Sequence, residues 1–306
     1  IDWLDWSRWP HPRRPLRAAD LIDAARAGDL NAVRCLLACG FAVDQRDAKG
    51  STALLHAAGS GELRIVQMLL NAGADAGVVA ATGATALSAA IMRGHAEVVR
   101  ELLTRQGVQS HRFDGGISPL MLAVALGRQE IAELLRAQGA DVCECDDLGN
   151  SLLHYLARFG FSAREPQAVL RHWQSLLGTP VVGLINQVNR RGETALMVLL
   201  GADAPPQAFV CEAGITQQIT LLVRHGAQLD GQTGSGASVL HLAAQRGALS
   251  LVDALLNLGA PRGLRDTIGR DASETALSKG YVDAAAALRT SSAPVSMARL
   301  LRQPEN

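Results

Sequence analysis

A 33-residue spacing of glycines is the feature that most limits what this chain can fold into. One series has 33-residue steps with a gap after its fifth member: Gly28, Gly61, Gly94, Gly127, Gly160, Gly247 and Gly280. A second series has steps of 33, 33, 33, 43, 44 and 33 residues: Gly50, Gly83, Gly116, Gly149, Gly192, Gly236 and Gly269. A fixed period of this length indicates a protein built from stacked structural repeats. With one unit before Gly50, around Arg17, the chain has about eight repeats, of which the fifth and sixth are enlarged by 10 and 11 residues.

Each unit is predicted to contain two helices and one turn. Two residues after each glycine of the second series stands a side chain that can cap a helix N-terminus: Thr52, Thr85, Ser118, Ser151, Thr194, Ser238 and Asp271. Apolar residues follow the cap, and the glycines of the first series are expected to end this helix in a left-handed conformation. A second helix carries apolar residues at helical spacing, as in Val66, Leu69 and Leu70, and ends at another glycine such as Gly73. The remaining residues of a unit have room for two short extended arms and a tight turn, together called a finger below.

The pattern resembles the ankyrin repeat. Two stretches come closest to the family's G-x-T-P-L-H pattern followed by Ala-Ala: Gly116-Ile117-Ser118-Pro119-Leu120-Met121 and Gly236-Ala237-Ser238-Val239-Leu240-His241-Leu242-Ala243-Ala244. The resemblance covers residues 17–289 and implies an all-α solenoid of helix-turn-helix units with short β-hairpin-like fingers. Residues 1–16 would form an N-terminal Trp/Pro/Arg-rich segment and 290–306 a C-terminal tail. His154 and His241 occupy the family's histidine position, where the ring is expected to bond backbone and brace adjoining repeats. Repeat eight, with its polar first helix, is expected to cap the array.

Composition and charge argue against several classes of protein. The chain has 29 basic and 29 acidic residues, so no overall charge draws it to nucleic acid or to an anionic membrane. The longest uncharged apolar run, 76–92, contains glycine, serine and threonine and is shorter than a membrane span. Five cysteines are an odd number, which argues against a disulfide framework and favours a reducing compartment such as the cytoplasm. Because residue 1 is Ile, an upstream anchor or secretion signal stays open, and the localisation is unknown.

No catalytic motif stands out, and neither a cofactor nor a metal is expected. An enzyme would need a site assembled across the two enlarged repeats, where Glu165, His172, Cys211 and Glu212 occur. Proteins that resemble ankyrin arrays bind partners through their fingers and the concave face of their first helices. The predicted function is therefore a non-catalytic protein–protein interaction module, with the chain acting as a monomer. The alternative is the targeting or recruiting part of a larger bacterial effector or membrane-anchored protein.

The variable finger and groove positions are unexpectedly basic. We predict that a partner contacts the following residues there: Arg46, Lys49, Arg93, Arg112, Arg158, Phe159, Arg190, Arg191, Arg246 and Arg265. Guanidinium groups suit carboxylates, so an acidic protein segment is the favoured partner. The competing interpretation is a solvated face with local ion pairs that contribute little. Nucleic acid is disfavoured, because only Phe113 and Phe159 stand beside the basic positions to stack on bases.

Two further segments carry alternatives. The extra residues of repeats five and six are expected mainly after Gly160 and Gly201, between the two helices of each repeat, where Phe161 and Phe209 are candidate contact residues. These insertions either form a functional lobe on one edge or are tolerated surface loops. Near the N-terminus a stripe consists of Trp3, Trp6 and Trp9. It either covers the open side of repeat one or docks on a membrane interface or partner.

Overall fold

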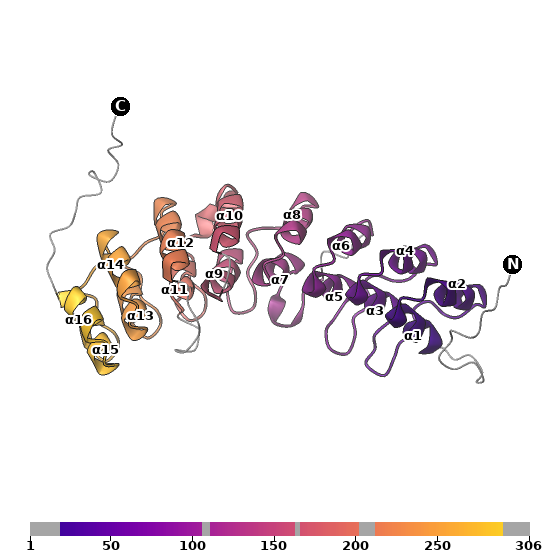
Figure 1. The fold of residues 1–306 in the computed structure, drawn as a ribbon, viewed down its shortest axis with the longest axis horizontal. Coiled ribbons are helices and arrows are strands. Elements are labelled where there is room, and N and C mark those ends of the chain that lie inside the picture. Colours follow the sequence, from indigo (N-terminus) through magenta and orange to yellow (C-terminus); the bar gives the residue numbers. More distant parts are fainter. Residues whose placement is uncertain (1–18, 106–110, 163–165, 202–211, 290–306) are drawn as a thin grey trace, which may run out of the picture. The chain divides into compact units, whose positions relative to one another are not determined.

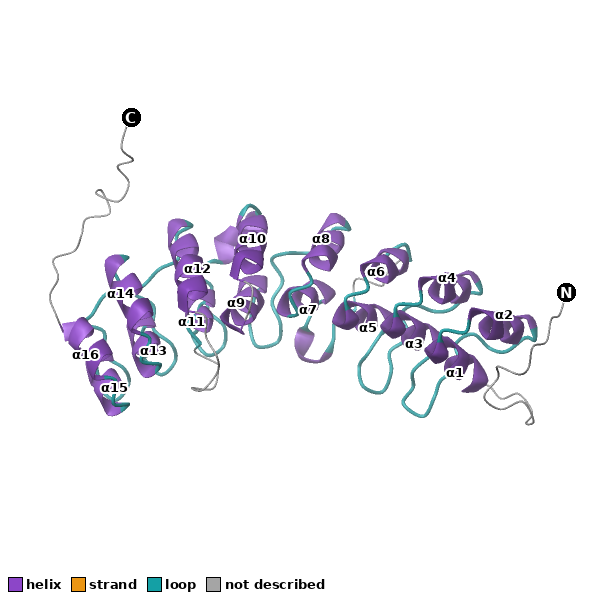
Figure 2. Cartoon of the chain, in the orientation of Figure 1, coloured by secondary structure: helices purple, strands orange, loops and turns teal. Residues whose placement is uncertain are grey.

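The computed structural model describes residues 19–105, 111–162, 166–201 and 212–289. The chain divides into two compact units, residues 1–113 (unit 1) and residues 114–306 (unit 2). The described part contains eight pairs of α-helices and isolated β-bridges. Its ribbon shows helices and loops and no strand (Figure 2). The expected all-α fold is confirmed.

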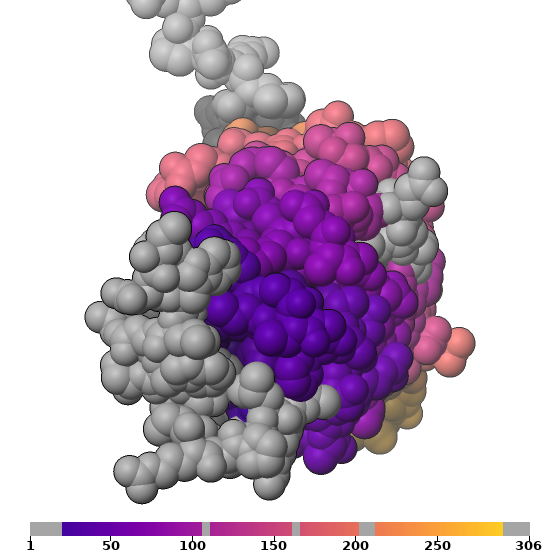
Figure 3. All heavy atoms as spheres, turned by 90° about the vertical axis from the view of Figure 1, so that its right-hand side faces the viewer, coloured from indigo at the N-terminus to yellow at the C-terminus, as the bar shows by residue number. Residues whose placement is uncertain are grey.

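The described part of unit 1 contains three helix pairs. Its helices are α1 (Ala19–Ala27), α2 (Leu30–Ala38), α3 (Ala53–Ser60), α4 (Leu63–Asn71), α5 (Ala86–Arg93) and α6 (Ala96–Leu102). The first helices α1, α3 and α5 form one row and the second helices α2, α4 and α6 the other (Figure 1). Helix α3 packs against both α1 and α5, so each repeat buries its apolar side on its neighbours. In the space-filling view of Figure 3, the atoms of the first repeat, in indigo, face the viewer.

The described part of unit 2 contains five helix pairs and two 3₁₀ turns. Its elements are η3 (Asp114–Gly116), α7 (Pro119–Ala125), α8 (Gln129–Ala137), α9 (Leu152–Ser162), α10 (Pro166–Leu177), η4 (Pro180–Leu184), α11 (Ala195–Leu199), α12 (Glu212–Arg224), α13 (Val239–Gln245), α14 (Leu249–Asn257), α15 (Ala272–Ser278) and α16 (Val282–Arg289). The same two rows recur within this unit (Figure 1). Helix α9 packs between α7 and α11, and α13 packs against α15.

The predicted caps and apolar stripes explain why these helices form. The Thr52 hydroxyl accepts a 3.3 Å bond from the Leu55 amide, and the Asp271 carboxylate accepts a 2.8 Å bond from the Glu274 amide. Each bond satisfies an amide that the helix itself leaves without an acceptor. The apolar residues after the caps are buried: for example Leu54, Leu120 and Leu240 are at most 1% exposed. Capping and burial therefore act together in each repeat.

Six of the seven first-series glycines adopt the left-handed backbone expected at a helix end, and Gly160 does not. Gly160 lies inside α9, which continues to Ser162, so the prediction of a helix stop at this residue was wrong. A Cβ atom on Gly160 would collide with the carboxamide of Gln218 on α12. The glycine at this position therefore allows α12 to approach α9 closely, which is a second reason for glycine in a repeat.

The enlargement of repeat five differs from the expectation, whereas most of the extra length of repeat six lies between its two helices, as expected. In repeat five only residues 163–165 separate α9 from α10, and most of the extra length lies in these two helices and in η4. In repeat six the extra length lies between α11 and the end of α12, which has 13 residues. Because the two repeats are enlarged in different places, the structure gives no common edge to both.

None of the described helices is both long enough and apolar enough to cross a membrane. The tryptophan stripe of Trp3, Trp6 and Trp9 and the tail 290–306 lie outside the described residues. Their predicted roles stay predictions.

Candidate protein-binding surface

The turns of neighbouring fingers, called fingertips here, are joined by backbone hydrogen bonds. In unit 2 four such bonds connect successive tips: Asp147 N to Gly115 O at 2.9 Å, Arg190 N to Leu148 O at 2.9 Å, Gly234 N to Arg191 O at 2.8 Å and Thr267 N to Ser235 O at 3.1 Å. In unit 1 the Ala81 amide donates to the Lys49 carbonyl at 2.9 Å in the same way. The repeat sequence therefore places its variable tip residues side by side at fixed spacing.

A buried polar network holds the tip of repeat six from below. The Asn189 side-chain oxygen accepts bonds of 2.9 Å and 3.0 Å from the amides of Arg191 and Glu193. Its amide nitrogen donates to the Asn150 oxygen at 3.0 Å and to the Glu193 carboxylate at 2.9 Å. Asn189 thus fixes its own turn and connects it to repeat five, with every polar atom of its side chain in use.

The network continues to a second buried carboxylate, Asp146. One of its oxygens accepts 2.8 Å bonds from the Asn150 amide nitrogen and the Tyr155 hydroxyl. Burial raises the pKa of Asp146, but these bonds, together with those from backbone amides, outweigh it and hold the pKa below its usual value. Burial and the bond to Asp146 raise the pKa of the Tyr155 hydroxyl, which stays protonated and donates. Asp146 is therefore a charged acceptor inside the fold.

The two histidines at the family's position brace neighbouring repeats, as the sequence implied. The Nε2 atom of His154 lies 2.9 Å from the Glu193 carbonyl, and that of His241 lies 3.0 Å from the Arg270 carbonyl. His154 Nδ1 accepts a 3.1 Å bond from the Ser151 amide, so Nε2 carries the proton. Burial lowers the pKa of His154, although the bond to the Glu193 carbonyl acts in the opposite direction. Both rings are structural.

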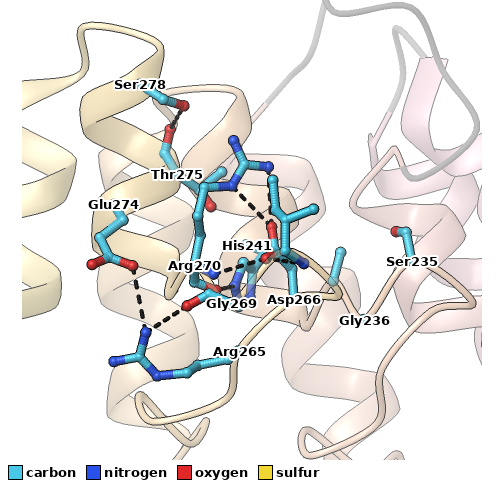
Figure 4. A network of polar contacts seen from close by, with 12 residues as sticks. Ser235, Gly236, His241, Arg265, Asp266, Gly269, Arg270, Glu274, Thr275 and Ser278 are labelled. Atoms are coloured by element: carbon cyan, nitrogen blue, oxygen red, sulfur yellow. Dashed lines mark hydrogen bonds and ion pairs between the residues drawn. The ribbon is translucent and has the colours of Figure 1, made fainter.

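In the finger of repeat eight, two arginines bind groups within their own repeat (Figure 4). The Arg265 guanidinium donates to the Gly269 carbonyl and lies 3.7 Å from the Glu274 carboxylate. Arg270 donates through Nε to Asp266 at 3.0 Å, and the same carboxylate accepts the Arg270 amide at 2.8 Å. Arg265 was predicted to contact a partner, and its guanidinium is already used to stabilise its own finger.

In unit 1 a corresponding finger contact involves a histidine. His56 Nε2 lies 3.1 Å from an Asp47 carboxylate oxygen and 3.3 Å from Arg26 Nη2, so the contact joins repeats one and two. The bond from His56, helped by amide bonds, holds the pKa of Asp47 below its usual value. Asp47 is a framework carboxylate, like Asp146 and Asp266 in unit 2.

The predicted partner-binding residues fall into two groups. One group is exposed, with side-chain nitrogens that make no hydrogen bond or ion pair in the described part of the chain: Arg46, Lys49, Arg93, Arg190 and Arg191. The other group has intramolecular contacts: Arg112, Arg158, Arg246 and Arg265. Arg246 is half-buried and donates to the carbonyls of Leu200 and Gly201 at 3.1 Å and 2.9 Å, where it satisfies the C-terminal end of α11.

Of the three predicted phenylalanines, only Phe159 has a side chain that the structure describes. The Phe159 ring lies over Gly127, where it would collide with a Cβ atom, so it packs repeat five on repeat four. The side chain of Phe161 and the whole of Phe209 lie outside what the structure describes.

Three exposed apolar residues of unit 2 were not anticipated. Leu148 and Ile268 occupy the tips of repeats five and eight and are 54% and 69% exposed, and Val188, just before tip six, is 53% exposed. Their signal in the sequence was their place near the turn, where most other repeats have polar or small residues. These three side chains are exposed and take no part in the apolar core of the described residues.

The geometry defines a class: a repeat protein whose paired helices stack and whose fingers present a row of variable residues. A family model described as "Ankyrin repeats (3 copies)" matches residues 21–114 and 57–146, and one described as "Ankyrin repeat" matches residues 235–267. The chain belongs to the ankyrin repeat family. Ankyrin repeats are typically non-catalytic modules, and the chain is a protein-interaction module.

Similarity to curated proteins covers only part of each. The chain is 29% identical over 174 residues to the B-cell lymphoma 3 protein homolog of Mus musculus, which is 49% of this chain and 37% of that protein. It is 29% identical over 161 residues, 52% of the chain, to the E3 ubiquitin-protein ligase KEG of Arabidopsis thaliana, of which 8% is covered. It is 27% identical over 135 residues, 44% of the chain, to the phosphocholine transferase AnkX of Legionella pneumophila, of which 12% is covered.

Proposed function

We propose that this protein binds a protein partner noncovalently through its fingers and the adjoining groove of first helices, and that the contacted part of the partner is acidic. The single observation that carries the proposal is the pair Arg190 and Arg191. Both are exposed at one fingertip, and their guanidinium groups have no acceptor within the described part of the chain. A guanidinium group can bind a carboxylate through two parallel hydrogen bonds, which favours acidic segments over neutral ones.

Unit 1 offers a second, smaller set of unpaired cations for the same kind of partner. Arg46 and Lys49 belong to the finger of repeat two, and Arg93 ends α5. The alternative interpretation, that basic residues only form local ion pairs, fits Arg265 but not these residues. Exposed intramolecular pairs contribute about 0–1 kcal/mol, so their absence costs the fold little and leaves the side chains available.

The enlarged parts of repeats five and six belong to the proposed binding surface. Helix α12 and residues 202–211 before it enlarge repeat six, and Phe209 would supply an apolar contact there, as Phe161 would in repeat five. Replacing residues 202–211 with a short linker should leave the helical circular dichroism signal intact and weaken partner binding. Unchanged binding would show that the insertion is a passenger.

The main test is a comparative capture experiment from the source cell. The full chain, the R190A/R191A variant and a control variant R171A/R224A serve as bait, and the bound proteins are quantified by mass spectrometry. Arg171 and Arg224 are exposed on α10 and α12 of the same two repeats, so the control removes equal charge from second helices. A partner should be retained by the control and lost by R190A/R191A. Equal capture by all three baits would refute a role for this fingertip.

A second candidate is a recruiting role within a larger protein. The chain spans 8% and 12% of two relatives whose names denote a ubiquitin ligase and a phosphocholine transferase. In such an arrangement the ankyrin repeats would deliver a partner to an activity located elsewhere. Sequencing the complete coding region in the source genome tests this, because an adjoining domain with a catalytic site is required.

A further inference from the structure

The fingertips of repeats five and six form a composite surface with apolar and basic components. The Arg190 amide donates a 2.9 Å bond to the Leu148 carbonyl, so these two residues lie on adjacent tips. Leu148 is 54% exposed, and Val188, two residues before Arg190, is 53% exposed. An exposed leucine beside two unpaired arginines is a combination that neither solubility nor folding requires.

The exposed acidic residue of the neighbouring tip, Asp147, does not neutralise the arginines. Asp147 shares the tip of repeat five with Leu148, but its carboxylate lies over repeat four: a Cβ atom on Gly116 would be 2.6 Å from its Oδ1. The buried carboxylates of Asp146 and Glu193 are occupied by the amide and hydroxyl groups of Asn150, Tyr155 and Asn189. The charge of the two arginines is therefore left for an external anion.

On its other side the arginine tip borders small residues. The next tip has the sequence Gly234-Ser235-Gly236, and the Gly234 amide donates to the Arg191 carbonyl at 2.8 Å. Gly192 approaches this tip so closely that a Cβ atom would lie 2.9 Å from the Gly234 nitrogen. No bulky side chain of repeat seven therefore stands at the tip beside the arginines, and an extended segment has room to continue over it.

The composite surface is held in place before any partner arrives. Arg190 and Arg191 are tied by their backbone to tips five and seven, and Asn189 fixes the turn through the Arg191 and Glu193 amides. Only side-chain rotamers remain to be ordered on binding. Because the backbone of this site is already fixed, only the bound segment loses backbone conformational entropy, which lowers the entropic cost of association.

We infer that the tips of repeats five and six form a docking site for an extended acidic peptide segment in which an apolar residue lies next to carboxylates. The carboxylates pair with Arg190 and Arg191, and the apolar side chain packs on Leu148 and Val188. This inference rests on the proposed protein-binding function and narrows it to one site and one class of segment. Asn189 acts as a positioning residue for the site.

The test uses a library of random linear peptides displayed on phage and selected against the full chain. The selected peptides should be enriched in Asp and Glu adjacent to Leu, Ile or Phe. Selection against R190A/R191A should lose the acidic enrichment and keep the apolar one. Selection against L148S/V188S should lose the apolar enrichment and keep the acidic one. The control L249S removes a similarly exposed leucine from α14 and should change neither preference.

A selected peptide, labelled with fluorescein, then gives affinities by fluorescence polarisation. R190A/R191A should weaken binding more than about tenfold, equivalent to about 1.4 kcal/mol. N189A should weaken binding and leave the circular dichroism spectrum unchanged. Both arginines are still present in this variant, but the turn that carries them has lost the hydrogen bonds from Asn189. Arginine-to-lysine replacement, R190K/R191K, should restore part of the affinity, since charge returns without the two-bond geometry.

Two results would overturn the inference. One is selection of peptides without acidic enrichment, and the other is full affinity of the selected peptides for R190A/R191A. If those peptides instead lose binding to R46A/K49A, the binding function stands and the site lies in unit 1. The capture experiment judges the function separately, because it does not depend on a short peptide being sufficient.

Discussion

The Arg190 amide donates a 2.9 Å hydrogen bond to the carbonyl oxygen of Leu148, which joins the tips of two enlarged repeats. This bond makes an exposed apolar residue and an exposed basic residue neighbours although 42 positions separate them in the sequence. The enlargement of repeat five lies in its helices and in η4, behind the fingers, and leaves the tip-to-tip spacing intact. A repeat can therefore be enlarged without breaking the hydrogen bonds that join neighbouring fingertips.

The buried network under this tip can be tested through its only hydroxyl group. Tyr155→Phe removes the 2.8 Å bond to Asp146 and leaves a buried carboxylate with one donor fewer. We expect a loss of about 1–3 kcal/mol in the free energy of unfolding, measured by urea denaturation. Tyr281→Phe is the matched control, because Tyr281 is 40% exposed and its hydroxyl has no described partner. Equal effects of both variants would mean that the network contributes nothing specific.

Two buried histidines predict a loss of stability in mild acid. Burial lowers the pKa of both His154 and His172, so the folded chain keeps the rings neutral. The unfolded chain protonates them as the pH falls through about 6.5, and it then binds more protons than the folded chain. The contribution of the two neutral rings to the free energy of unfolding is thus fully present above that pH. It declines as the pH falls below about 6.5, by up to about 1.4 kcal/mol per pH unit for each ring.

Urea denaturation across this pH range checks the prediction. The double variant H154Q/H172Q should be less stable than the wild type at pH 7, with a shallower pH dependence. The control H225Q changes an exposed ring at the end of α12 and should keep the wild-type slope. A double variant with the slope of the wild type would assign the acid sensitivity to other groups.

The packing between repeats four and five can be tested at a glycine. Gly127 has φ +65° and lies under the Phe159 ring, whereas Gly139 has φ +84° and nothing within 4 Å of where a Cβ would lie. In both Gly→Ala variants, backbone strain should lower the free energy of unfolding by about 1–2 kcal/mol. Gly127→Ala should lose about 1–3 kcal/mol more, because the ring must move. Equal melting temperatures for the two variants would contradict the packing described for Phe159.

Much of the fold could be predicted because its determinants are local. A cap such as Thr52, a left-handed glycine such as Gly73 and a histidine such as His241 each specify a short-range geometry that the period then repeats. Gly160 was misassigned because its reason for being glycine, the approach of Gln218, lies 58 residues away.

The site was less predictable, because whether a cation is available depends on its neighbours in space. Arg246 and Arg191 look alike in the sequence, yet one binds the end of α11 and the other has no side-chain acceptor among the described residues. Leu148 could not be told from a core leucine by residue type, and only its place at the tip of the turn distinguishes it.

The most direct test of the central claim is the salt dependence of partner affinity. Using the partner identified by capture, equilibrium binding is measured by calorimetry at increasing sodium chloride for the wild type, R190A/R191A and R171A/R224A. Charges exposed at the fingertips are screened over about 8 Å at physiological ionic strength. The wild type and the control should therefore bind tightly at low salt and weaken together as salt rises, and R190A/R191A should bind more weakly, with a shallower salt dependence. Retention of both affinity and salt dependence by R190A/R191A would contradict the account.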